Sequence, residues 1–202
     1  MKDPKEEKRL KKVVDFLFEA GMLKKTPRTG FQFLGTGKES VAEHSFRTAI
    51  IGYVLAKIEG ADWKKVLLMC LFHDFHEART GDFNYVNRMY NRSDEIRAFK
   101  DALCFTGIED EIISVIQELN SVSSYEAVLA HDADQLDLIL TLKEEYDLGN
   151  KYAMVWIEYA IKRLRSDIGK KIAELIKDTD HTDWWFKGVD PSWWAKKNGQ
   201  KE

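Results

Sequence analysis

Residues 67–82 read Leu-Leu-Met-Cys-Leu-Phe-His-Asp-Phe-His-Glu-Ala-Arg-Thr-Gly-Asp, an apolar run followed directly by imidazoles and carboxylates. The apolar first half is typical of a helix that lies in the core of a domain. The second half then brings His73, Asp74, Glu77 and Asp82 within ten positions. Burial of such groups is costly unless they are paired or bound to a metal. We therefore interpret this stretch as a site, most simply one that holds a cation.

The composition of the chain limits the classes of function. Its 34 acidic and 31 basic residues leave a net charge of −3, so the composition offers no argument for a surface that binds nucleic acid. A hydrophobic content of 44% over 202 residues is enough for the core of one domain. No apolar run approaches the roughly 18 residues of a membrane span, and the Lys/Glu-rich start is unlike a secretory signal. We expect a cytoplasmic protein that binds neither nucleic acid nor membranes.

The spacing of apolar residues predicts an all-α fold. Helices are expected over residues 6–20, 40–59, 62–74, 93–103, 109–119 and 152–177, with another running from 123 or 124 past 140. No segment alternates over the length of a strand. We expect a single-domain helical bundle over residues 1–180, with its motifs within about 24–140 and an aromatic-rich tail over 181–202.

Two of these expectations concern particular side chains. Ser40 and Glu43 form a capping box that begins a helix, whose buried face is predicted to carry Val41, Ala49, Ile50, Tyr53 and Val54. The two cysteines, Cys70 and Cys104, each lie in an apolar helical setting. We expect core thiols rather than a disulfide.

Further polar residues lie within the predicted helices. Considered alone, His44 is interpreted as a hydrogen-bonded histidine of the core rather than as a metal ligand. Asp134 has apolar residues one turn away on either side, so it is expected to point inward, where a carboxylate needs a partner. The second His-Asp pair, His131-Asp132, is interpreted as exposed. Arg28 alone reads as a solvated surface charge.

Together, His44, His73, Asp74 and Asp134 place two imidazoles and two carboxylates on three predicted helices. Structural zinc sites favour thiolates, whereas this set suits a six-coordinate cation such as Mn²⁺, Fe²⁺, Co²⁺ or Mg²⁺. An open metal lowers the pKa of a bound water and polarises a phosphoryl oxygen. A bundle in which these polar residues only satisfy one another is the alternative reading.

The chain resembles the HD-domain phosphohydrolases and, among them, the 5′-deoxynucleotidase branch. The resemblance covers about residues 10–150 and rests on segments that occur in the order of the family. These segments are Pro27-Arg-Thr-Gly30, Glu39-Ser-Val-Ala-Glu-His-Ser45, His73-Asp74 with Glu77 and Gly81-Asp82, and Asp134-Gln135 followed by an apolar helix.

The resemblance implies a role for each residue of the site. One divalent cation (Co, Mn, Fe or Mg) would be held by His44, His73, Asp74 and Asp134. Glu77 would orient or deprotonate the attacking water, and Asp82 would lie near the leaving 5′-oxygen or the sugar. Arg28 would clamp the phosphate, because a planar guanidinium can bond two oxygens at once. The resemblance also implies a homodimer.

The leading hypothesis is metal-dependent hydrolysis of a deoxynucleoside 5′-monophosphate to nucleoside and phosphate. One alternative is an HD-family hydrolase of a di- or triphosphate or an alarmone, for which Arg79, Arg88 and Arg92 are the candidate extra cations. Another is a non-catalytic metal- and nucleotide-binding protein. That role would not require Glu77.

Overall fold

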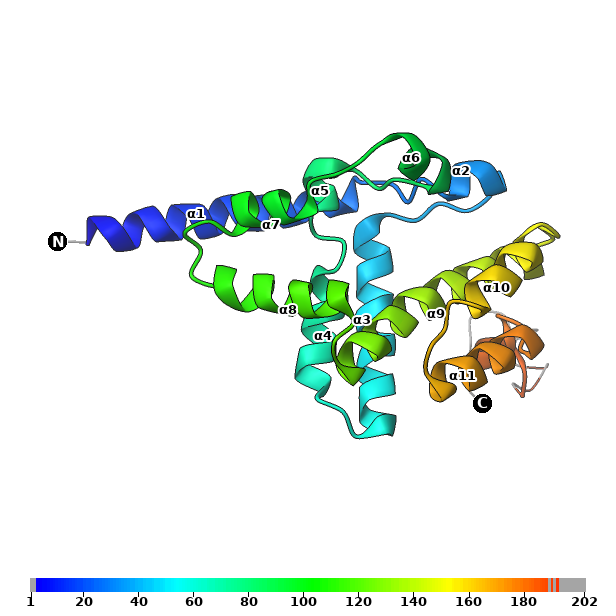
Figure 1. Cartoon of the computed structure of the whole chain (residues 1–202). Helices are drawn as coiled ribbons and strands as arrows, with labels where there is room; N and C mark the ends of the chain where they lie inside the picture. The colour runs from blue at the N-terminus through cyan, green and yellow to red at the C-terminus, as the bar shows by residue number, and fades with distance from the viewer. Residues whose placement is uncertain (1–2, 189, 191, 193–202) are drawn as a thin grey trace.

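A computed structural model describes residues 3–188, 190 and 192 (Figure 1). These residues form helices and no β-strand, and a single isolated bridge joins Pro27 to Ser40. The prediction of an all-α fold is therefore confirmed. None of the described helices is long and apolar enough to cross a bilayer.

The elements follow one another along the chain with short connections. They are α1 (Pro4–Ala20), the 3₁₀ helix η1 (Gly21–Lys24), α2 (Phe31–Leu34), α3 (Val41–Glu59), α4 (Trp63–Phe72), α5 (Glu77–Thr80), α6 (Tyr85–Tyr90), α7 (Glu95–Leu103), α8 (Glu109–Ser121), α9 (Tyr125–Asp147), α10 (Ala153–Ile161), α11 (Asp167–Asp178) and α12 (Asp183–Phe186).

Three helices, α3, α4 and α9, form the centre of the fold. α3 and α4 pack side by side and α9 crosses both, while α8, α10 and α11 pack on α9 (Figure 1). Leu55, Met69 and Leu136, one from each central helix, are fully buried. Each such side chain contributes about 1.5–3 kcal/mol by leaving water. His44 and Asp134 lie on α3 and α9, and His73 and Asp74 directly follow α4, so the best-packed part of the molecule positions these four residues.

The start of α3 has the predicted capping box. The backbone N–H of Ser40 donates to Glu43 Oε2 over 2.7 Å, and the N–H of Glu43 donates to Ser40 Oγ over 3.2 Å. Within α3, Gly52 permits a close approach to α4, because a Cβ there would lie 2.5 Å from Cys70 Sγ. The cap and this contact fix both the start of α3 and its distance from α4.

The predicted buried face of α3 is only partly correct. Val41 and Ala49 are buried, but Ile50, Tyr53 and Val54 are between 41% and 49% exposed. The face that packs on α4 and α9 instead carries small and polar residues, which let the helices approach closely. Its buried members are His44, Ser45, Thr48, Gly52, Leu55 and Ala56. An exposed row, here called the α3 stripe, remains on the outer face and consists of Phe46, Ile50, Val54 and Ile58.

The single helix expected over residues 152–177 is wrong, and so is the exposed reading of Asp132. The chain leaves the helix after Ile161 and begins α11 at Asp167. Asp132 of α9 is fully buried and accepts hydrogen bonds from the backbone N–H groups of Arg165 (2.9 Å) and Ser166 (2.8 Å). The buried carboxylate thus holds the break between the helices. Ser166 Oγ then caps α11 by accepting from Gly169.

The cysteines behave differently from each other. Cys70 is buried as expected, and burial raises the pKa of its thiol. Cys104 is exposed, contrary to the prediction, because it directly follows α7 where the chain turns outward. Both are free thiols.

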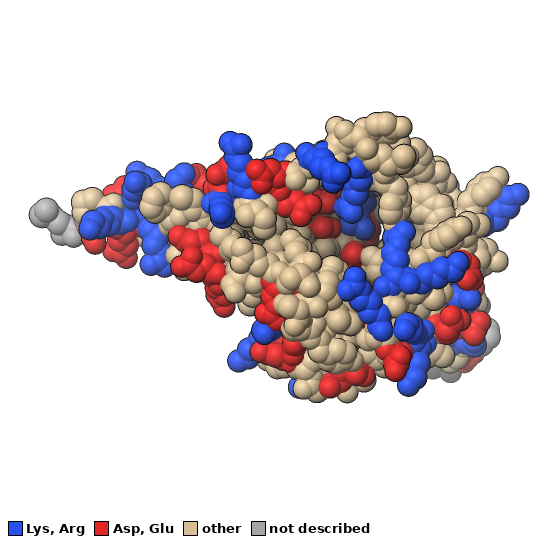
Figure 2. Space-filling view, in the orientation of Figure 1, with Lys and Arg blue, Asp and Glu red and all other residues tan. Residues whose placement is uncertain are grey.

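Both ends of the described chain expose apolar side chains. α1 projects from the body and has no buried residue (Figure 2). In the predicted tail, Trp184 is 86% exposed, whereas Trp193 and Trp194 lie outside the described residues. Figure 2 also shows acidic and basic side chains interspersed over this face, in line with the near-neutral net charge.

Candidate metal centre and substrate cavity

The candidate ligands come from three helices and meet at one point. His44 lies in the second turn of α3, and Asp134 lies in the middle of α9. α4 ends at Phe72, so His73 caps its C-terminus and Asp74 lies in the turn that follows. Glu77 begins the separate short helix α5, so the helix predicted over residues 62–74 does not continue to Glu77. The turn after α4 aims these side chains at α3 and α9.

The ligand atoms lie close enough together to share one ion. His44 Nε2 is 3.1 Å from His73 Nε2, 3.2 Å from Asp134 Oδ1 and 3.6 Å from Asp74 Oδ2. His73 Nε2 is 3.1 Å from Asp74 Oδ2 and 3.9 Å from Asp134 Oδ1. Separations of this size are those between neighbouring ligands of a cation bound at about 2.0–2.2 Å.

The hydrogen bonds of the two imidazoles indicate that the site is built for a cation. His44 Nδ1 donates to Asp137 Oδ2 over 2.5 Å, and His73 Nδ1 donates to the carbonyl oxygen of Cys70 over 2.9 Å. Because both partners only accept, each Nδ1 carries a proton, and Nε2 is the nitrogen left to face a metal. Two carboxylates that converge on these two Nε2 atoms require a positive charge between them, either a cation or protons on the imidazoles. The residues therefore fit a divalent cation.

A loop before α3 holds Arg28 beside the ligands. Arg28 Nη1 donates to Asp74 Oδ2 over 3.1 Å. The next residue, Thr29, receives the side chain of Asp82: its N–H donates to Asp82 Oδ2 over 2.5 Å, and its Oγ1 donates to the Asp82 carbonyl over 3.0 Å. Asp82 thus fixes the loop that carries Arg28.

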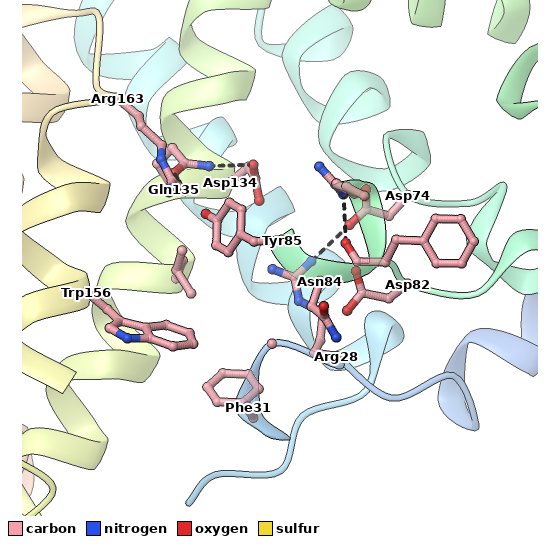
Figure 3. Close-up of a pocket in the computed structure, with 14 residues that line it drawn as sticks. Arg28, Phe31, Asp74, Asp82, Asn84, Tyr85, Asp134, Gln135, Trp156 and Arg163 are labelled. Carbon is pink, nitrogen blue, oxygen red and sulfur yellow. Dashed lines mark hydrogen bonds and ion pairs between the residues drawn. The ribbon is translucent and has the colours of Figure 1, made fainter. Parts of the chain in front are cut away.

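A cavity of about 380 Å³ opens beside these groups (Figure 3). One end presents Arg28, Asp74, Asp82 and Asp134. The other end is largely apolar and includes Phe31, Tyr85, Leu138 and Trp156, with Gln135 and Arg163 beside them. The shape and lining suit a ligand with a charged head and a flat apolar body.

Glu77 does not line this cavity but a neighbouring one, and the two cavities share Phe83 and Arg88. Glu77 is 3% exposed, and its Oε2 has no hydrogen-bond partner among the residues the structure describes. Glu77 lines a neighbouring pocket of about 220 Å³ together with Arg88 and Arg92. Burial, then the charges of Asp74 and Asp82, raise the pKa of Glu77 to about 9. Strongly shifted pKa values cluster at functional sites. The positive charge of a bound cation nearby would lower this pKa and leave Oε2 free to accept a proton.

Comparison with known proteins places this arrangement in a family. A family model described as "HD domain" matches residues 20–176, more than half of the chain. The chain belongs to the HD-domain family. It is 30% identical over 145 residues to the 5′-deoxynucleotidase HDDC2 of Bos taurus, covering 69% of this chain and 70% of that protein. It is 25% identical to a 5′-deoxynucleotidase of Vibrio vulnificus, with 76% and 81% covered.

The fold is also similar to that of a solved structure. A conserved hypothetical protein from Pyrococcus furiosus is 28% identical, and the superposition covers 82% of this chain and 99% of that one with a TM-score of 0.68. The assignment to the HD-domain 5′-deoxynucleotidases, made from sequence, is confirmed by these relatives.

Behind His44, the HD domain contains two buried or half-buried residues, Asp137 and Arg47, that were not predicted from the sequence. Asp137 is fully buried, and besides His44 it accepts from Arg47 Nε. Arg47 also bonds Thr141 and donates to Glu144 Oε1 over 2.7 Å. A carboxylate behind a ligand histidine orients the ring and raises its basicity. A usable signal was the three-residue spacing from His44 to Arg47 and from Asp134 to Asp137, which places each pair on one helix face.

Charge within the HD site shifts the pKa of the ligands in opposite directions. Burial by itself would lower the pKa of His73. The nearby carboxylates of Asp74 and Asp134 have a larger, opposite effect and raise this pKa to about 9. Burial raises the pKa of Asp134, but His44, His73 and Arg28 outweigh that effect and hold the pKa below its usual range. In the absence of a metal, protons on the imidazoles supply the positive charge that the carboxylates require.

Because a proton and a metal ion compete for the same nitrogen of His73, we expect cation binding to release protons. Below pH 9 the His73 imidazole is protonated, and it must lose that proton before Nε2 can bind a metal. The affinity for Mn²⁺ should therefore rise by up to about tenfold per pH unit for each proton released as pH increases toward that pKa. Calorimetric titration of Mn²⁺ in buffers of different ionisation enthalpy measures the number of protons released. An affinity independent of pH from 6.5 to about 9 would contradict the prediction.

Proposed function

We propose that this protein hydrolyses deoxynucleoside 5′-monophosphates to deoxynucleosides and phosphate. The observation that carries the proposal is that two imidazoles, two carboxylates and Arg28 converge at the charged end of a cavity whose other end is aromatic. A nucleotide has the same division, with an anionic phosphate at one end and a flat base at the other. The names of the relatives point to the same substrate class.

In this proposal His44, His73, Asp74 and Asp134 hold one divalent cation, whose identity among Co, Mn, Fe and Mg is open. When bound, such an ion lowers the pKa of a water and neutralises charge on a phosphoryl oxygen. Arg28 contacts Asp74 beside this set and faces the cavity with its other N–H groups. These four residues set the place of the phosphate in the cavity.

The remaining residues bind and orient the reactants. Arg28 donates to two phosphate oxygens, a geometry that a planar guanidinium provides. Glu77 accepts a proton from the attacking water at Oε2, the oxygen that has no partner in the described part of the chain. Asp82 keeps Thr29, and with it Arg28, in place, and it lines the cavity, where it would lie near the leaving 5′-oxygen or the sugar. Aligning the water while neutralising charge is what slow phosphate-ester hydrolysis requires.

The test is phosphate release from a panel of nucleotides. Protein freed of metal by EDTA is supplied with Co²⁺, Mn²⁺, Fe²⁺ or Mg²⁺ and given deoxy- and ribonucleoside monophosphates, with the di- and triphosphates for comparison. Metal-dependent release from the deoxynucleoside monophosphates is expected. Release from di- or triphosphates alone would replace the proposal with its nearest alternative, and tight nucleotide binding without release would indicate a non-catalytic protein.

We further propose that the protein acts in the cytoplasm as a homodimer. The α3 stripe supports the assembly, because four large apolar side chains on one exposed helix face favour burial against a second copy. Replacing Ile50 with Asp at the centre of the stripe should then convert a dimer to a monomer in sedimentation velocity. Lys171→Asp on the exposed side of α11 is the control. A monomeric parent protein would refute the assembly.

A further inference from the structure

The far end of the cavity is lined by the aromatic rings of Phe31, Tyr85 and Trp156. Trp156 of α10 packs against the loop that carries Arg28, since a Cβ on Gly30 would lie 4.0 Å from its Cζ3. Phe31 and Tyr85 lie on other sides of the same space (Figure 3). Bases stack on such rings for about 1–3 kcal/mol whatever their identity. Stacking alone therefore binds every base and selects none.

Arg163 provides hydrogen-bond donors at this end of the cavity. Its guanidinium lies over the Tyr85 ring, 4.9 Å from the centroid, and its Nη1 donates to Gln135 Oε1 over 3.3 Å. Gln135 is itself held, because its Nε2 donates to Asp134 Oδ2 over 2.8 Å (Figure 3). The amide oxygen therefore faces Arg163 and keeps the guanidinium at the cavity. The side chain forms no ion pair with a carboxylate of the described residues, so its other N–H groups are open to a ligand.

The position of Arg163 determines which edge of a base it meets. If the phosphate lies at Arg28 and the ligand set, the sugar follows and the base extends toward the aromatic end. The edge of a base farthest from its sugar carries an oxygen in guanine, hypoxanthine, thymine and uracil, and an amino group in adenine and cytosine. A guanidinium donates five hydrogen bonds and accepts none. It can pair with the oxygen but not with the amino group.

We propose that Arg163 is a specificity-determining residue that selects nucleotides with an oxo group on the distal edge of the base over those with an amino group. The inference rests on the proposed function for the orientation of the ligand. It predicts preference for deoxyguanosine, deoxyinosine, deoxyuridine and thymidine monophosphates. Deoxyadenosine and deoxycytidine monophosphates are the disfavoured class.

Two matched pairs of substrates test this selection. dIMP and dAMP have the same size and differ at the distal edge, and so do dUMP and dCMP. The oxo member of each pair should have a kcat/KM about tenfold higher, the discrimination that a good arginine–base contact provides. Arg163→Ala should reduce both ratios to near one. Arg163→Lys should give intermediate ratios, because one ammonium retains charge but lacks the planar fork.

Lys162→Ala is the matched control. Lys162 is the neighbouring cation, but it lies over Tyr159 and does not line the cavity. This variant should keep both ratios. Arg163→Ala should fold normally, since the side chain is exposed and surface substitutions cost little. Absence of a preference in the parent protein, or a loss in Arg163→Ala that is equal for oxo and amino substrates, would overturn the proposal.

A binding measurement separates this inference from the proposed reaction. Calorimetry with dIMP and dAMP on the Mn²⁺-loaded Glu77→Gln variant, with and without Arg163→Ala, reports base selection with little turnover. A preference for dIMP that disappears in Arg163→Ala supports the inference even if no nucleotide is hydrolysed, in which case only the proposed function fails. Hydrolysis of every deoxynucleotide with equal affinity for dIMP and dAMP refutes the inference and leaves the proposed function intact.

Discussion

Replacement of Glu77 by glutamine is expected to lower kcat for deoxynucleoside monophosphate hydrolysis by about 10²- to 10⁴-fold, the range for loss of a general base. The amide has nearly the same shape as the carboxylate but no basic oxygen to accept a proton from water. Glu77 is not one of the four proposed ligands, so the variant should still bind a stoichiometric metal ion. The measurements are kcat under saturating substrate and the metal content of the purified protein.

Glu95→Gln is the control for this prediction. Glu95 lines the same small pocket as Glu77, but its side chain is 46% exposed and contacts His76 rather than the ligand set. Its replacement should change kcat by no more than about twofold, as expected for a surface group. Full activity in Glu77→Gln would show that another group activates the water. Loss of the metal in that variant would instead make Glu77 a structural support of the site.

Replacement of Asp137 by alanine is expected to lower the free energy of unfolding by about 3–5 kcal/mol, the cost of breaking a buried ion pair from one side. Asp137 is fully buried between His44 and Arg47. Its removal leaves the Arg47 guanidinium without its buried partner and frees the His44 ring to rotate. Metal affinity should fall by about 10- to 100-fold, as for other carboxylates behind a metal-binding histidine.

Urea denaturation in EDTA measures the stability change without the contribution of bound metal. Asp101→Ala is the control, because that side chain is 54% exposed and only borders Arg79 and Arg97. It should change stability by at most about 0.5 kcal/mol. A similarly small effect of Asp137→Ala would mean that the Asp137–Arg47 network is not needed for the packing of α3 on α9.

Local features of this chain were readable from its sequence because their causes lie within one or two turns. The capping box at Ser40 involves Glu43, three residues away, and Ser124 begins α9 by accepting from Ala127. The apolar run 67–72 predicted a core helix, and the structure has it as α4, which ends at Phe72 with His73 as its cap. The residue types of the candidate site were also available, since mixed imidazoles and carboxylates in apolar settings need a common partner.

The tertiary structure decided which residues meet, because contacts across the fold depend on the path of the whole chain. Arg47 and Asp137 are 90 positions apart, and Asp132 reaches Ser166 across 34. No local pattern reports that second contact, so the break after Ile161 was missed and the buried Asp132 was taken for a surface residue. The same holds for the far end of the cavity, where Trp156 and Arg163 arrive from α10 and the turn after it. The sequence determined the helices and the chemical character of the site, whereas packing of α3, α4 and α9 determined the partners of each side chain.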